Sequence, residues 1–90
     1  MPIVYCSDGF CELTGYSRAQ IMQKSCACDF LYGHRTDAQH KESIHGALER
    51  KSELKLEVIL YRRSGECCGA NFRLRQSLIE LRPRGRLQLD

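Results

Sequence analysis

The sequence contains no tryptophan and only two prolines, and it has no long apolar segment. Its longest aliphatic run is Val58–Tyr61, far shorter than the roughly 20 apolar residues that a membrane-spanning helix needs. With 90 residues, 42% hydrophobic and 28% charged, the chain has the length and composition of one small globular domain. Such a domain buries only roughly 60% of its unfolded surface, so it is marginally stable. We therefore exclude a transmembrane segment and a two-domain enzyme.

The N-terminal residues lack the basic segment, apolar core and cleavage site of a secretory signal. The six cysteines include no C-x-x-C pair, and neighbours such as Cys67 and Cys68 do not easily converge on one tetrahedral ion. We therefore expect an intracellular chain with free thiols and no metal site.

The charge is divided unevenly along the chain. Residues 1–61 contain seven Lys or Arg against eight Asp or Glu, whereas residues 62–90 contain seven against three, and all seven are arginine. Such a change is unusual within one evenly built domain. We therefore divide the chain into a patterned region, residues 1–65, and a divergent arginine-rich end, residues 66–90, that completes or replaces the last strands of a sheet.

Capping residues predict several short helices in the first half of the chain. Ser7 is suited to begin a helical turn, and Ser17–Gln20 forms a capping box for a second short helix. Asp29–Gly33 predicts a further turn. A capping box at Thr36–Gln39 begins the longest helix, which we expect to end near Lys51.

Strands follow in the second half. Leu54–Tyr61 and Ala70–Arg75 both alternate apolar and polar residues, which predicts an antiparallel pair. A turn around Pro83 predicts one more hairpin, between Ile79–Leu81 and Leu87–Leu89. This order of elements predicts an α+β fold with an antiparallel β-sheet and short helices packed on one face.

Motifs of catalysis are missing. The sequence has no glycine-rich phosphate loop and no G-x-S-x-G nucleophile turn. Cys28, with His40 and Asp37 downstream, could serve as nucleophile, base and orienter, but no local signature of a cysteine hydrolase surrounds it. We favour a buried structural thiol and expect no enzymatic activity.

The arginines of the divergent end, from Arg73 to Arg86, could contact the phosphates of a nucleic acid or an anionic lipid. Few aromatic residues lie among them to stack on bases. We therefore favour a solvated sheet face and expect no nucleic-acid partner.

The stretch from Ile3 to Arg18, IVYCSDGFCELTGYSR, resembles the N-terminal PAS domain of ether-à-go-go type voltage-gated potassium channels, particularly the Elk branch. The resemblance continues through Ile21–Gly33 and Glu57–Gly65 and covers roughly two thirds of the chain. It implies a PAS fold in truncated form, because the family's first strand and its preceding cap would lie upstream of Met1.

The resemblance implies a regulatory domain at the cytoplasmic face of the plasma membrane, with no cofactor and with membrane contact only through the rest of the channel. Domains of this family dock on the channel's cyclic-nucleotide-binding homology domain and modulate gating. By matching position, Tyr5 would belong to an exposed apolar patch and Arg18 to a charged contact with that partner. The alternatives are a half-buried strand residue for Tyr5 and a solvated first-turn side chain for Arg18.

A related branch, the flavin-binding LOV domains, implies an alternative function as a ligand- or flavin-binding sensor. Cys28 matches the position of the cysteine that forms the flavin adduct. Asp29, Tyr32 and Leu60 stand in place of an arginine, a glutamine and an asparagine that contact the flavin. A carboxylate repels phosphate and leucine cannot hydrogen-bond the ring, so these replacements argue against flavin.

The resemblance ends after Gly65. A Phe-Trp pair and a Pro-Ile-Lys-Asn-Glu turn typical of the family are replaced by Glu66–Gly69 and an arginine-rich tail. The break coincides with the change in composition. We interpret it as the result of alternative splicing, a shifted reading frame or an erroneous gene model.

Overall fold

The computed structural model describes residues 5–24 and 28–84. These residues form a four-stranded sheet, three α-helices and one short 3-10 helix, η1. In chain order the elements are β1 (Tyr5–Cys6), α1 (Asp8–Thr14), α2 (Arg18–Gln23), η1 (Asp29–Leu31), α3 (Ala38–Arg50), β2 (Leu54–Tyr61), β3 (Cys67–Arg75) and β4 (Leu78–Pro83).

Two predicted helix caps in the first half are confirmed. The side chain of Ser7 accepts a hydrogen bond from the backbone N–H of Phe10, and α1 ends at Gly15, whose φ of 81° is left-handed. Ser17 and Gln20 form the full capping box of α2, each side chain accepting from the other residue's backbone N–H. These bonds satisfy N–H groups that a helix start leaves without partners.

The long helix α3 ends as predicted, with Lys51 in the left-handed conformation, but its start differs. Asp37, not Thr36, is the N-cap, and its carboxylate accepts from the backbone N–H of Gln39. The capping box predicted at Thr36 is therefore wrong. The hydroxyl of Thr36 donates instead to the carbonyl oxygen of Ile59, which fixes the start of α3 to the edge strand β2.

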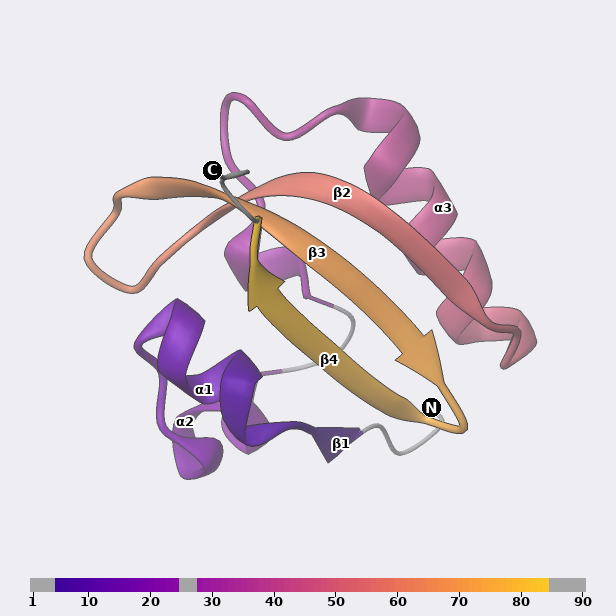
Figure 1. The fold of residues 1–90 in the computed structure, drawn as a ribbon, viewed down its shortest axis with the longest axis horizontal. Helices are drawn as coiled ribbons and strands as arrows, with labels where there is room; N and C mark the ends of the chain where they lie inside the picture. Colours follow the sequence, from indigo (N-terminus) through magenta and orange to yellow (C-terminus); the bar gives the residue numbers. More distant parts are fainter. Residues whose placement is uncertain (1–4, 25–27, 85–90) are drawn as a thin grey trace, which may run out of the picture.

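The strand order in the sheet is β1-β4-β3-β2 (Figure 1). β2 and β3 are antiparallel, with Leu54 opposite Leu74, which confirms the predicted pair. β3 and β4 are also antiparallel, whereas β1 lies parallel to β4 over two residues.

Only part of the last predicted hairpin can be compared with the structure. Ile79–Leu81 does lie in a strand, but β4 makes its hairpin with β3, through a two-residue turn at Gln76 and Ser77. Both turn residues have positive φ, 53° and 66°, as a tight hairpin turn requires. Leu87–Leu89, the other predicted partner, lies outside the described residues.

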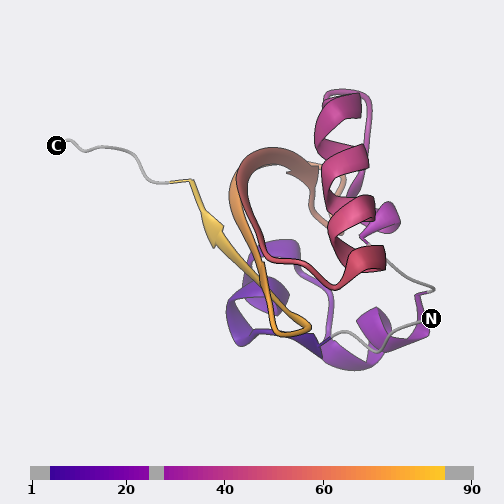
Figure 2. The same cartoon turned by 90° about the vertical axis from the view of Figure 1, so that its right-hand side faces the viewer.

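The helices and one face of the sheet enclose the hydrophobic core (Figure 2). α1 packs against β4 and α3 against β2. Strand residues facing this core alternate with exposed ones, so the opposite face is largely polar. We call that opposite side the outer face. The buried core residues are Phe10, Leu13, Cys28, Leu31, Ile44, Ala47, Leu48, Val58, Leu60, Ala70, Phe72, Leu74, Ile79 and Leu81.

Candidate docking edge

Two exposed apolar side chains lie next to each other at the end of the sheet. Tyr5 and Leu78 are opposite each other in the parallel pair of β1 and β4. Tyr5 is 63% exposed and Leu78 is 36% exposed, whereas the next residues in their strands, Cys6 and Ile79, pack on the core. Exposed tyrosine combines a large apolar area with a polar tip, as is typical of protein interfaces. The structure therefore places Tyr5 at the surface rather than half-buried in its strand.

Arg18 is the first residue of α2, and its guanidinium group connects three elements. It donates a hydrogen bond to the carbonyl oxygen of Cys6 and forms an ion pair with the carboxylate of Asp8. These partners offset the unfavourable position of a cation at a helix N-terminus. Arg18 therefore links α2 to β1 and α1. Its side chain is still 52% exposed, so a partner can also reach it.

Met22 follows Arg18 by one turn on the same face of α2 and is 81% exposed. We call the surface formed by Tyr5, Arg18, Met22 and Leu78 the docking edge. Arg18 reaches Cys6, the residue after Tyr5, so the two residues predicted from the sequence lie at the same edge. Met22 and Leu78 were not identified from the sequence, because their exposure depends on how α2 and β4 are placed.

Burial raises the pKa of the Cys6 thiol from 9.0 to about 11. The nearby Cys11 also raises this pKa, while the guanidinium group of Arg18 lowers it. The Cys6 thiol is therefore protonated at neutral pH and packs as a small apolar side chain.

This shift predicts a loss of stability at alkaline pH. In the unfolded chain Cys6 ionises near its ordinary pKa of 9.0, whereas in the folded chain it keeps its proton until about pH 11. The unfolded state thus binds fewer protons in this window, and the free energy of unfolding falls as pH rises through it. Urea midpoints measured across the window should fall less steeply for Cys6→Ala. The exposed Cys67→Ala serves as the control and should retain the wild-type slope.

The arginines of the divergent end share the outer face. Arg73, Arg75, Arg82 and Arg84 are all exposed, while Arg86 lies outside the described residues. Arg84 forms an ion pair with Glu57 of β2 at 3.1 Å. Their exposure agrees with the solvated face expected from the sequence, but their concentration on one face gives that face a basic character.

In the part of the chain that the structure describes, no cluster of three or more His, Cys, Asp or Glu residues could hold a metal ion. Cys6, Cys11, Cys67 and Cys68 are free thiols. Within the same residues, no helix has the length and apolar content needed to cross a bilayer.

A family model described as a PAS domain matches residues 1–82. The chain belongs to the PAS domain family. This PAS domain is 58% identical over 64 residues to the human voltage-gated inwardly rectifying potassium channel KCNH3, and 55% identical over 64 residues to the human delayed rectifier KCNH4. Each match covers 71% of this chain and 6% of the relative, so the chain spans a small part of these channels.

Solved structures support the same assignment. The PAS domain superposes on the crystal structure of the PAS domain from the fruit-fly ELK potassium channel with a TM-score of 0.70 and 60% sequence identity. That match covers 80% of this chain and 58% of the other. The predicted α+β PAS fold and the predicted resemblance to ether-à-go-go channel PAS domains are both confirmed.

Blue-light receptors of the LOV branch are more distant. The dark structure of the Aureochrome1 LOV domain is 36% identical, with a TM-score of 0.62, and the match covers 80% of this chain and 51% of that one. In this PAS domain Cys28 and Leu60 are both buried in the core, whereas Asp29 is exposed. Leu60 offers no hydrogen bond to a flavin ring, and Asp29 offers no cation to its phosphate. The residues present therefore do not fit a flavin.

Proposed function

We propose that this PAS domain is a cytoplasmic regulatory module of an Elk-like voltage-gated potassium channel. It acts by docking on the channel's cyclic-nucleotide-binding homology domain and so modulates gating. The observation that carries the proposal is the docking edge, where the exposed ring of Tyr5 lies near the accessible guanidinium group of Arg18. The potassium channels among its relatives support the assignment to a channel.

The chemistry of the docking edge supports binding rather than catalysis. Tyr5 and Leu78 supply apolar area that a partner can bury, and Arg18 supplies a cation that a partner carboxylate can pair with. Tyrosine and arginine are among the residue types enriched where binding energy concentrates in interfaces. We therefore propose a non-enzymatic role, with location at the inner face of the plasma membrane through the rest of the channel.

Reversing the charge of Arg18 tests the docking. We expect Arg18→Glu to weaken binding of the separately purified cyclic-nucleotide-binding homology domain of an Elk channel by roughly tenfold, because one charged contact becomes repulsive. The measurement is isothermal titration calorimetry. Arg50→Glu has the same change in net charge on an exposed residue of α3 and should bind like the wild type.

Arg18 also braces the domain internally, so a second variant separates the two roles. The swap Asp8→Arg with Arg18→Glu restores an ion pair between these positions but leaves a carboxylate facing the partner. If docking uses Arg18, the swap stays defective in binding while its thermal stability recovers. Full recovery of binding by the swap would show that Arg18 acts only inside the domain and would remove it from the interface.

A further inference from the structure

The outer face carries most of the charge imbalance of the molecule. Cross-strand rows run over it in register, with Lys55 opposite Arg73 and Arg73 opposite Glu80. The face bears two acidic residues, Glu57 and Glu80, against five basic ones: Lys55, Arg73, Arg75, Arg82 and Arg84. This excess equals the formal net charge of the whole chain, +3, so the remaining residues are balanced.

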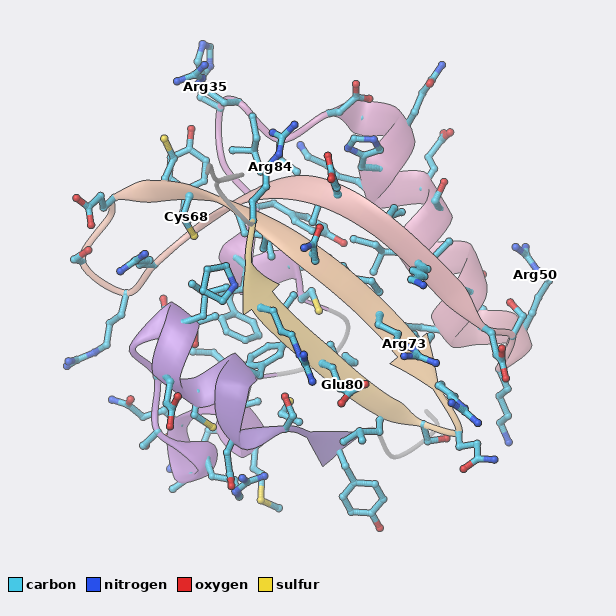
Figure 3. The ribbon with its side chains drawn as sticks, viewed as in Figure 1. Arg35, Arg50, Cys68, Arg73, Glu80 and Arg84 are labelled. Atoms are coloured by element: carbon cyan, nitrogen blue, oxygen red, sulfur yellow. The ribbon has the colours of Figure 1, made fainter. Side chains whose placement is uncertain are left out.

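The two acidic side chains do not neutralise this face. Glu57 pairs with Arg84, and Glu80 stands opposite Arg73 on the neighbouring strand (Figure 3). Among the described residues, no ion pair is formed by Lys55, Arg75 or Arg82. Neighbouring side chains of like charge repel each other. An anion bound between these cations would reduce that electrostatic repulsion.

A shallow depression of about 250 Å³ lies at the centre of the face. Its lining is formed by Lys55, Asn71, Arg73, Glu80 and Arg82, which come from all three long strands. The cations there surround an amide that can donate or accept hydrogen bonds. The depression thus offers several donors to carboxylates that approach from outside.

We infer that the outer face binds an extended acidic segment of a partner protein. In an extended peptide alternate side chains point the same way, so carboxylates at every second residue can reach successive basic side chains on one sheet face. Glu57 and Glu80 interrupt the positive surface, and they would repel a continuous polyanion such as a nucleic acid or an anionic bilayer. A peptide can place its carboxylates to avoid them.

The position of the aromatic residues also disfavours nucleic acid. Successive bases need aromatic side chains spaced along the groove, whereas Tyr5 and Tyr61 lie at opposite corners of the sheet, in its two edge strands. The inferred site does not include Tyr5, Arg18 or Met22, so it stands independently of the docking proposed above.

Fluorescence anisotropy with a labelled peptide of alternating glutamate and glycine tests this inference. We expect binding at low salt that weakens as salt rises, and no binding of the matched glutamine-glycine peptide. The double variant Arg73→Gln with Arg82→Gln should weaken binding roughly tenfold, because it removes two cations of the depression. Its control, Arg35→Gln with Arg50→Gln, changes net charge equally at two residues that do not line the depression (Figure 3), and it should bind within about twofold of the wild type.

A gain of affinity provides a readout that misfolding cannot imitate. Glu80→Gln removes the negative charge inside the depression and should tighten peptide binding by several-fold. Three results would overturn the inference: no peptide binding at low salt, equal weakening by both double variants, or Arg73-dependent binding only of polyuridylate or phosphatidylserine vesicles.

Discussion

Phe72→Ala is expected to destabilise the domain by about 3–5 kcal/mol, the cost of removing a phenylalanine from a packed core. Phe72 lies in the middle of β3, is 1% exposed, and has Leu56 and Leu81 opposite it on the two neighbouring strands. Small domains have free energies of unfolding of about 5–15 kcal/mol, and this chain belongs at the lower end. We expect the variant to be largely unfolded by circular dichroism and urea titration.

Asn71→Ala is the matched control, because Asn71 is the preceding residue of the same strand and is exposed on the outer face. Its free energy of unfolding, from urea titration, should stay within about 0.5 kcal/mol of the wild-type value. The comparison also tests the boundary drawn at Gly65. If Phe72→Ala and Asn71→Ala unfold at the same urea concentration, Phe72 does not contribute to the core. The divergent end would then not complete the core through β3 and β4.

Local hydrogen bonds explain why the helix starts could be predicted from the sequence. The bonds that begin α1 and α2 join residues three apart, at Ser7 and Ser17, so the sequence alone contains both partners. Thr36 shows where this reasoning fails. It has the residue type and spacing of a capping box, but its hydroxyl bonds to Ile59, 23 residues away, and Asp37 takes the cap.

The hairpin between β3 and β4 was not predicted from the sequence. Proline and glycine near residue 83 carry strong turn chemistry, whereas Gln76 and Ser77 do not, although a tight turn with two positive φ values normally favours Asn or Gly. The pairing of Phe72 with Leu81 and of Leu74 with Ile79 places apolar residues on the core face, and this packing outweighs the cost of the turn.

The candidate site was predictable only in part, because it too depends on contacts between residues far apart in the sequence. Tyr5 and Arg18 were identified through a resemblance over contiguous sequence. The ion pair of Arg18 with Asp8 and the pairing of Tyr5 with Leu78 depend on tertiary contacts that no local pattern reveals. Leu78 also lies in the divergent end, where the resemblance offers no guide.

Gly33→Ala is expected to destabilise the domain by about 1–3 kcal/mol through overpacking. A Cβ atom at Gly33 would lie 2.7 Å from Cζ of the Tyr61 ring, with two further ring atoms closer still. The ring cannot move away freely, because its hydroxyl oxygen accepts a hydrogen bond from the backbone N–H of Arg35. The same loop is held by Thr36, whose hydroxyl accepts from the N–H of Gly33 and donates to β2.

The backbone at Gly33 is not itself strained, since its φ lies outside the left-handed region that Gly15 and Gly65 occupy. The cost of the methyl group should therefore depend on Tyr61 alone. In a Tyr61→Ala background, Gly33→Ala is expected to be neutral or to stabilise by about 0.4–1 kcal/mol, because alanine reduces the entropy of the unfolded chain. A double-mutant cycle from urea unfolding measures this change of sign. An equal cost of Gly33→Ala in both backgrounds would show that the loop does not pack on the Tyr61 ring.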